Sequence, residues 1–209
     1  AKALADMGYK EVNFNLGCPA GTVVAGGRGA AMLRDLYKLE QFLDTIFSAQ
    51  LPVVISIKTR IGWEKLSEFT DLIPLFNRYP IKELIIHPRL KVEQYKGFVH
   101  TTTFANAFSE LTMPVAFNGD IVTVENCVTL DQRFPDLSSL MIGRGLVADP
   151  ALARKVKGGK AASREELQRF ASELYEAHLL AWGDKKNALM RMKEYWWFFA
   201  NLFVDSQKP

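Results

Sequence analysis

The sequence predicts an α/β fold, the carboxyl-terminal five βα units of a (β/α)8 TIM barrel, followed by a small helical domain. Short apolar runs rich in β-branched and aromatic residues alternate with segments of helical spacing, the pattern of βα units around a parallel sheet. Polar or glycine-containing sequence follows every apolar run, and barrel active sites lie at the carboxyl ends of the strands. After Gly158 and Gly159 only helical periodicity remains.

The apolar runs predict five strands, because Val, Ile and Phe pack well on a pleated sheet. In chain order the strands are Glu11–Leu16, Val53–Lys58, Glu83–Ile86, Val115–Phe117 and Ser138–Ile142. Apolar residues at helical spacing predict helices at Leu36–Ala49, Leu66–Arg78, Thr101–Leu111 and Thr123–Phe134. The strands follow one another at intervals of roughly 25 to 40 residues, a usual size for βαβ units.

A closed barrel of this class has eight strands, so further strands are expected before Ala1. At ~30 residues per unit they correspond to about 90 residues. Ala1–Gly8 is expected to be the end of a helix, with Gly8 as its C-cap. The alternative is a doubly wound open sheet, which binds ligands at one or two crevice loops. Functional-looking residues in all the strand-end loops favour the barrel.

Two helices are expected beyond the strand pattern. Ser163 and Glu166 have the spacing of a capping box, which predicts a helix start. Gly183-Asp184 interrupts the helical periodicity, and a second helix is expected from about Lys185 to Val204. The predicted domains are therefore a partial barrel over residues 1–158 and a helical domain over residues 159–209.

Composition excludes several classes of protein. The chain has 209 residues, 48% of them hydrophobic, and no apolar run approaches the ~20 residues that span a bilayer. Two cysteines argue against a disulfide framework and for a reducing compartment, which predicts a cytoplasmic protein. No metal-ligand spacing is present. Residues 150–209 carry 11 Lys and Arg against 7 Asp and Glu, which suits either a phosphate-binding appendage or a solvated helical face.

Cys18 is the candidate catalytic residue. It directly follows the first predicted strand, between Gly17, which allows a tight bend, and Pro19, which restricts the backbone. A thiol that is protonated at neutral pH can act as a general acid. The alternative role is that of a buried packing residue, which is expected for Cys127 because it lies in a helical pattern.

Polar residues also follow the other four strands. Lys58 and Arg60 lie two residues apart at the second strand, so both can point the same way. His87-Pro88-Arg89 follows the third, Asn118-Gly119-Asp120 the fourth and Gly143-Arg144-Gly145 the fifth. The last two motifs suit the phosphate-binding position of many barrels, since glycines let backbone N–H groups approach a phosphate. Taken one at a time, these residues have simpler alternative roles: Lys58 a solvated lysine, His87 a structural histidine, and Asn118-Gly119 an ordinary turn.

Seven ordered motifs resemble the signature of the tRNA-dihydrouridine synthases. They are Asn13-Phe14-Asn15-Leu16-Gly17-Cys18-Pro19, Gly26-Gly27-Arg28-Gly29-Ala30-Ala31-Met32-Leu33, Ile57-Lys58-Thr59-Arg60-Ile61-Gly62, Ile86-His87-Pro88-Arg89, Gln94-Tyr95-Lys96-Gly97, Asn118-Gly119-Asp120-Ile121 and Met141-Ile142-Gly143-Arg144-Gly145.

The resemblance implies reduction of uridine in tRNA to 5,6-dihydrouridine, in an FMN-binding barrel domain with a tRNA-binding helical domain behind it. NADPH reduces the flavin, which passes hydride to C6 of the uracil, and Cys18 gives a proton to C5. The resemblance also implies which residues contact FMN: Lys58, His87, Asn118, Gly119, Asp120, Gly143 and Arg144. It implies that the substrate is contacted by Asn15, Arg60 and Arg89.

The sequence departs from the family pattern at a few places. Ala20-Gly21-Thr22 stands where many members carry a serine and a lysine, and Leu90 where threonine is frequent. The amino-terminal barrel strands, which carry further flavin contacts in the family, precede the first motif and are not in the chain. Two alternatives stay open: another FMN barrel oxidoreductase acting on a free pyrimidine, and a non-catalytic RNA-binding barrel fragment.

Overall fold

The computed structural model describes residues 1–202, which form two compact units. The first unit comprises residues 1–119 and 134–141, and holds the whole sheet. The second comprises residues 120–133 and the described residues from 142 onward, and is helical. The predicted domain boundary after residue 158 stays a prediction, and the contacts group the short helices before it with the helical unit.

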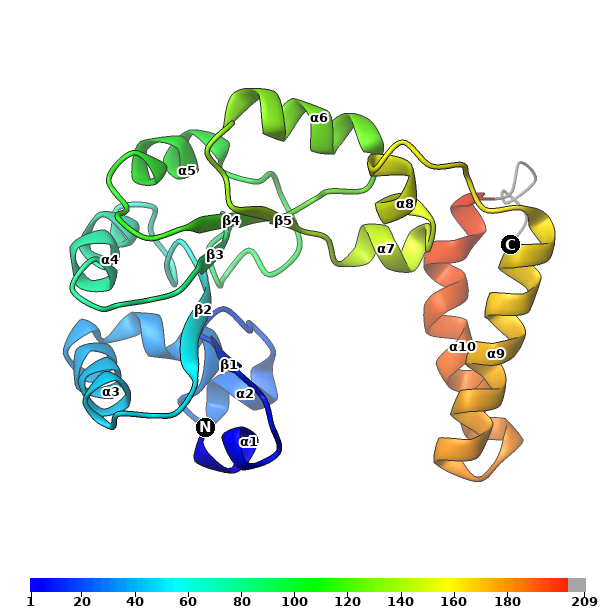
Figure 1. Cartoon of the computed structure of the whole chain (residues 1–209), viewed down its shortest axis with the longest axis horizontal. Coiled ribbons are helices and arrows are strands. Elements are labelled where there is room, and N and C mark those ends of the chain that lie inside the picture. Colours follow the sequence, from blue (N-terminus) through cyan, green and yellow to red (C-terminus); the bar gives the residue numbers. More distant parts are fainter. Residues whose placement is uncertain (203–209) are drawn as a thin grey trace. The chain divides into compact units, whose positions relative to one another are not determined.

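The sheet of the first unit has five parallel strands (Figure 1). They are β1 (Glu11–Asn15), β2 (Val54–Arg60), β3 (Leu84–His87), β4 (Val115–Asn118) and β5 (Ser139–Met141), paired in the order β1-β2-β3-β4-β5. Neighbours in sequence are neighbours in space, as in a barrel wall, whereas a doubly wound sheet reverses its order at a switch point. The predicted α/β fold is confirmed, and over residues 1–202 the sheet is open.

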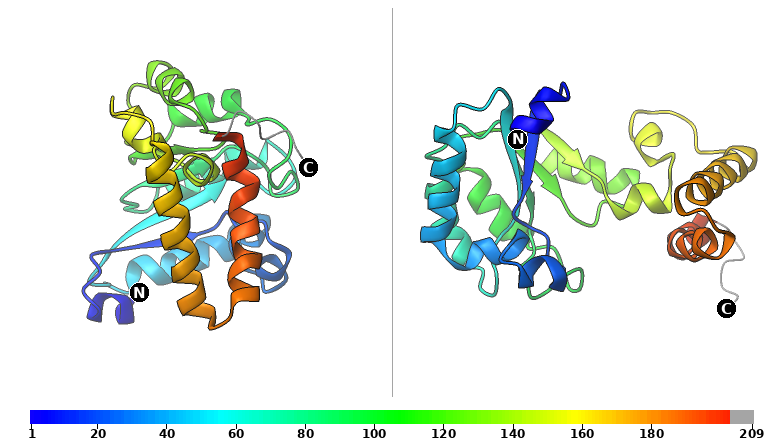
Figure 2. Two further views of the ribbon diagram at one scale, coloured as in Figure 1. Left: turned by 90° about the vertical axis from the view of Figure 1, so that its right-hand side faces the viewer. Right: turned by 90° about the horizontal axis from the view of Figure 1, so that it is seen from below.

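Three helices lie along one face of this sheet: α3 (Leu36–Ser48), α4 (Glu68–Phe76) and α5 (Thr101–Phe108) (Figures 1 and 2). Aromatic rings fill the space beneath them. Phe14 of β1 meets Phe42 of α3 edge-on, with ring centroids 5.5 Å apart. Phe104 of α5 lies 4.9 Å from the ring of Phe117 of β4 and 5.1 Å from that of Phe134. Alternate strand residues therefore build the core on the helical face.

The opposite face of the sheet is polar. Paired residues of parallel strands share a face, and Asn13 pairs with Ser56, Asn15 with Lys58 and Arg60 with His87. Asn13 Nδ2 donates a hydrogen bond of 2.9 Å to Ser56 Oγ. A strand period of two thus separates a polar face, which ends in the candidate site residues, from the apolar face that binds the helices.

Several element bounds differ from the expected ones. β2 runs on through Thr59 and Arg60 because Arg60 pairs with His87 in register. α4 starts at Glu68 instead of Leu66, since the Glu68 carboxylate accepts N–H groups of the preceding loop. α1 (Lys2–Asp6) lies in the expected helix end at Ala1–Gly8, but its C-cap is Met7, and Gly8 follows with a φ of 90°. Four short elements outside the predicted helices have too few residues to show a helical period: α2 (Gly21–Ala25), η1 (Gly29–Arg34), α7 (Arg144–Ala148) and α8 (Leu152–Val156).

The second unit contains α6 (Val124–Arg133), α7, α8, α9 (Arg164–Trp182), α10 (Lys185–Phe199) and η2 (Ala200–Leu202). α9 and α10 lie side by side as an antiparallel hairpin (Figure 2). Gly183 ends α9 with a φ of 73°, and the Asp184 carboxylate caps α10 by accepting the Asn187 N–H. The predicted break is confirmed, whereas the predicted helix end at Val204 lies outside the described residues. None of the helices up to residue 202 has the length and apolarity needed to cross a membrane.

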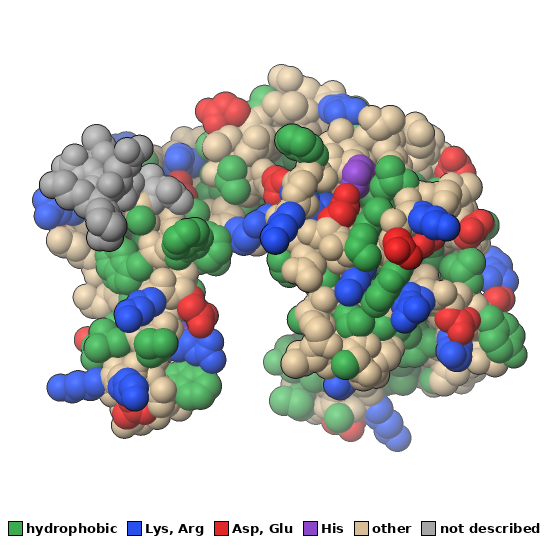
Figure 3. Space-filling view, turned by 180° about the vertical axis from the view of Figure 1, so that it is seen from behind, with side chains coloured by type: hydrophobic (Ala, Val, Ile, Leu, Met, Phe, Trp, Pro, Cys, Tyr) green, Lys and Arg blue, Asp and Glu red, His purple; other side chains and the backbone are tan. Residues whose placement is uncertain are grey.

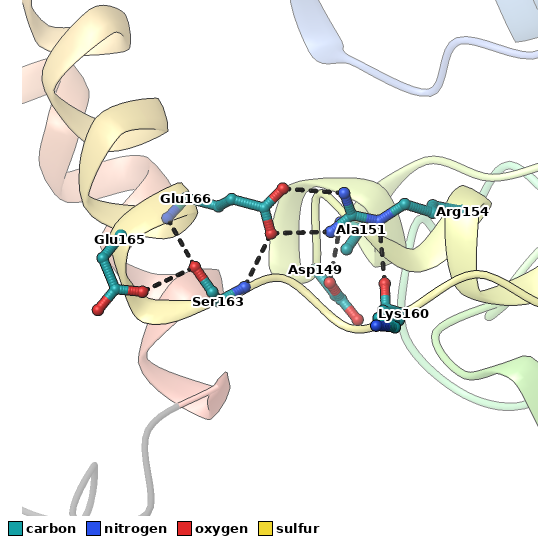
Figure 4. A network of polar contacts seen from close by, with 7 residues as sticks. All are labelled: Asp149, Ala151, Arg154, Lys160, Ser163, Glu165 and Glu166. Carbon is teal, nitrogen blue, oxygen red and sulfur yellow. Dashed lines mark hydrogen bonds and ion pairs between the residues drawn. The ribbon is translucent and has the colours of Figure 1, made fainter.

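The start of α9 is fixed by a network of polar contacts (Figure 4). Ser163 Oγ accepts the Glu166 N–H at 3.2 Å, and Glu166 Oε2 accepts the Ser163 N–H at 2.9 Å, so the predicted capping box is confirmed. Arg154 of α8 binds both carboxylate oxygens of Glu166, at 2.9 and 3.1 Å. The hydrogen bonds from Arg154 and from the Ser163 backbone lower the pKa of Glu166 to about 2.

Replacing Ser163 with alanine is expected to destabilise the helical unit by about 1 kcal/mol, because the Glu166 N–H loses its acceptor. Urea unfolding followed by circular dichroism measures this change. Ser172, exposed in the middle of α9, is the matched control, since the same substitution there favours the helix. Equal effects at both positions would contradict a specific capping role for Ser163.

Candidate active site

The candidate site of the first unit lies at the carboxyl ends of β1 to β4. The strands deliver Asn15, Lys58, His87 and Asn118 to this edge, and Cys18 follows β1 in the next turn. Parallel pairing places the strand ends together, as the alternation of strands and helices predicted.

The turn that carries Cys18 is held from both sides. The Asn15 side chain accepts the Gly17 N–H at 3.0 Å, and the Cys18 carbonyl accepts the Ala30 N–H at 3.0 Å. Gly29 lies so close to Cys18 that a Cβ there would come within 2.7 Å of the Cys18 carbonyl oxygen, and its φ is +59°. The glycine-rich loop therefore folds against the half-buried Cys18, which only glycine permits at position 29.

Lys58 is a partly buried cation on the polar face of the sheet. Its ammonium has no hydrogen bond or ion pair within residues 1–202. Burial and the nearby Arg60 charge lower the pKa of Lys58 to about 8, while interaction with Cys18 acts in the opposite direction. A buried ammonium without a counter-charge is costly, so an anionic ligand at this position relieves an existing penalty.

Arg60 is almost fully buried, with 1% of its surface exposed. Its Nε donates to the Gly17 carbonyl and its Nη1 to the Leu90 carbonyl, both at 2.9 Å. Its guanidinium carbon lies 5.4 Å from the Tyr95 ring centroid. Arg60 thus ties the Cys18 turn to the loop after β3, and its predicted contact with substrate stays a prediction.

Arg89 organises the same loop. Its Nη1 lies 3.1 Å from Nε2 of His87, and its Nη2 donates to the Gly97 carbonyl at 2.7 Å. Like Arg60 it is 1% exposed, so both guanidinium groups hold backbone around the site. The structure therefore brings the predicted residue Arg89 against His87, while a direct role in substrate binding stays a prediction.

Sequence reasoning assigned no role to Glu93, Tyr95 or His100 of the loop between β3 and α5. Glu93 accepts the Leu90 N–H at 2.6 Å, and its other oxygen lies 2.6 Å from His100 Nε2. The Tyr95 ring lies 6.4 Å from that of His87 and, as noted, beside Arg60. Tyr95 occurs in one of the quoted motifs, but no local pattern signals the Glu93–His100 pair.

The remaining predicted residues divide between the two units. In the first, Asn118 Nδ2 donates to the Met141 carbonyl at 2.8 Å, and a Cβ at Gly119 would lie 3.2 Å from His87. In the second, Arg144 Nη2 binds Asp120 Oδ1 at 2.9 Å, and Gly143 directly precedes α7. Phosphate or flavin binding by these residues stays a prediction. Across residues 1–202 no cluster of three potential metal ligands occurs.

The chain matches known proteins along nearly its whole length. The family profile described as "Dihydrouridine synthase (Dus)" covers residues 1–206. A "Probable tRNA-dihydrouridine synthase" of Rhodobacter capsulatus is 30% identical, over 95% of this chain and 63% of the relative. The "tRNA-dihydrouridine synthase B" of Pseudomonas aeruginosa is 28% identical over 97% and 63%, and the "tRNA-dihydrouridine(16) synthase" of Neisseria meningitidis 26% over 96% and 62%. The chain spans less than two thirds of the length of these relatives. As the sequence motifs predicted, it belongs to the dihydrouridine synthase family.

Proposed function

We propose that this protein reduces uridines in tRNA to 5,6-dihydrouridine, with FMN as its cofactor and NADPH as the reductant. Membership of the dihydrouridine synthase family supports the reaction. The single observation that carries the proposal is the geometry of the strand ends: Cys18 lies in the turn after β1, and the end of β1 pairs in register with Lys58 of β2 (Asn15 opposite Lys58). A cytoplasmic location suits a tRNA substrate and two free cysteines.

The residues of the polar face fit a flavin. Lys58 offers a cation without a counter-charge to the N1–C2=O edge of the ring, which carries negative charge in the reduced state. His87 and the Asn118-Gly119 turn border the same face, and Gly119 leaves the backbone free of a side chain beside His87. Within the second unit, the ion pair of Arg144 with Asp120 next to Gly143 supports a separate proposal, that these three residues bind a phosphate group. When bound, reduced FMN supplies the hydride that goes to C6 of the uracil.

Cys18 supplies the matching proton to C5. Its Sγ–H bond breaks as the C5–H bond forms, and the sulfur keeps the electron pair, so Cys18 becomes a thiolate. The nearby Lys58 ammonium stabilises that negative charge, because the two groups interact electrostatically. Cys18 is only half-buried, so solvent can return the proton. Asn15 and Arg60 fix the turn, which keeps the thiol in place during the reaction.

The helical unit is proposed to bind tRNA. Basic and hydrophobic side chains lie next to one another over α9 and α10 (Figure 3). Trp182 and Trp197 are 51% and 79% exposed, and the Arg191 guanidinium lies 5.2 Å from the Trp182 ring centroid. Exposed aromatic rings can stack on unpaired bases, and Lys and Arg bind phosphates in a salt-dependent way.

The test begins with the visible absorption spectrum of the purified chain after addition of FMN and gel filtration. A retained flavin band is expected, and addition of NADPH and unmodified tRNA is then expected to yield dihydrouridine. Reduction of free uracil compounds without tRNA would instead indicate a free-pyrimidine oxidoreductase. Salt-sensitive tRNA binding without flavin retention would indicate a non-catalytic RNA-binding fragment.

A further inference from the structure

Two cations surround one tryptophan ring beside the candidate site. The Arg34 guanidinium carbon lies 4.7 Å from the Trp63 ring centroid, and the Lys91 ammonium nitrogen lies 4.4 Å from it. The two charges are therefore no more than about 9 Å apart, the sum of these distances. Within residues 1–202 neither side chain has a hydrogen bond or an ion pair with a carboxylate.

The three residues come from loops that follow adjacent strands. Arg34 ends η1, after β1, while Trp63 follows β2 and Lys91 follows β3. The last two loops are joined by backbone hydrogen bonds, from the Lys91 N–H to the Gly62 carbonyl at 2.9 Å and from the Val92 N–H to the Trp63 carbonyl at 3.1 Å. Arg34, Trp63 and Lys91 therefore lie at the same edge of the sheet as Cys18, and the loops of Trp63 and Lys91 are held together by these hydrogen bonds.

Two acidic residues near these loops, Glu68 and Glu93, bind other groups. Glu68 accepts the backbone N–H groups of residues 63 to 65, and Glu93 accepts the Leu90 N–H and contacts His100. Two more acids, Glu64 and Asp71, line a cavity of about 360 Å³ that Arg34 and Trp63 also border. Lys91 does not line that cavity, so an anion shared by both cations lies outside it.

We propose that Arg34, Trp63 and Lys91 form a binding site for the phosphodiester backbone of the RNA strand that carries the target uridine. The inference rests on the proposed tRNA substrate. Two like charges held near one ring repel each other, and a phosphate between them removes that repulsion. The ring keeps both cations in place through cation–π contacts, so little side-chain freedom is lost on binding. Each of the three residues lies two to five positions beyond a residue of the Cys18 site, namely Gly29, Arg60 and Arg89.

The test compares tRNA affinity over a range of salt concentrations for the unsubstituted protein and for the double variant Arg34→Gln/Lys91→Gln. Loss of two phosphate contacts is expected to weaken binding about tenfold at low salt and to reduce the slope of log K against log salt by about 1.5. The matched control is Arg78→Gln/Lys82→Gln. It removes the same charges, which pair with Glu40 and Glu11 away from the carboxyl ends of the strands.

Flavin retention in each variant checks that the site is still folded. An unchanged salt slope in the double variant, with tRNA binding by the unsubstituted protein intact, would overturn this inference and leave the proposed function standing. Equal losses in the control would also overturn it, since the effect would then reflect net charge alone. If the unsubstituted protein binds no tRNA at any salt concentration, the proposed function itself fails.

Discussion

Replacing Cys18 with alanine is expected to slow dihydrouridine formation by roughly 10²- to 10⁴-fold, while flavin and tRNA binding stay close to those of the unsubstituted protein. The thiol is the proton donor at the end of β1, and alanine has no proton to give. The Cys18 backbone is held by the Asn15 and Ala30 contacts, which the substitution leaves in place. The reaction thus loses its acid without losing the turn that carries it.

The measurement is the rate of dihydrouridine formation in tRNA at saturating substrate, with the flavin spectrum recorded alongside. Cys127→Ala is the matched control, because it removes the other thiol. Cys127 is buried in α6, and burial raises the pKa of its thiol, so it stays protonated and takes no part in the reaction. A Cys18→Ala variant that forms dihydrouridine at the rate of the control would remove Cys18 from the mechanism.

Much of the fold of each unit was predictable because its signals are local. Apolar runs marked each strand, and parallel pairing alone places the carboxyl ends of all the strands at one edge of the sheet. The Ser163–Glu166 capping box and the Gly183-Asp184 break needed only a few neighbouring residues, and both stand where the sequence placed them. Lys58 and Arg60, two residues apart on an extended strand, share a face as the strand period requires.

The role of Arg60 was not predictable, because its partners are distant in sequence. Its hydrogen bonds reach carbonyls 43 and 30 residues away, and an arginine at a strand end gives no sign that it will be buried. Glu93 was missed for a different reason: its partners Leu90 and His100 are near in sequence, but the loop that its carboxylate closes has no periodic pattern. The backbone partners of a buried charge such as Arg60 come from distant parts of the chain and are brought together only by the complete fold. The sequence alone therefore could not predict these hydrogen bonds.

Replacing Lys58 with methionine is expected to stabilise the flavin-free protein at pH 7. Burial lowers the pKa of Lys58 from 10.5 to about 8, which means that the folded state disfavours its charge by roughly 3 kcal/mol. Methionine has a similar shape and no charge, so it removes this penalty. Because the surroundings relax, a gain of about 1 to 3 kcal/mol is expected.

The stability gained by the Lys58→Met substitution is expected to depend on pH. Between pH 8 and 10.5 the unfolded chain holds a proton on Lys58 that the folded chain has released, so the stability of the unsubstituted protein rises with pH in this window. The methionine side chain of the Lys58→Met variant does not titrate, so the advantage of the variant shrinks over the same window. Urea unfolding at pH 7 and at pH 10 measures both effects. Lys38→Met, at an exposed lysine beside Asp35, is the control and is expected to give no such gain.

The same substitution is expected to weaken FMN binding, because the ammonium that destabilises the empty site is the one that meets the negative charge of the flavin. In the unsubstituted protein, FMN affinity should fall as the pH rises through about 8, where Lys58 loses its proton. A Lys58→Met variant that is more stable and yet binds FMN as well as before would remove Lys58 from the flavin site. A variant that is no more stable at pH 7 would instead mean that a protein contact already compensates its charge. Greater stability together with weaker binding would show that this site keeps an unfavourable buried charge because the ligand requires it.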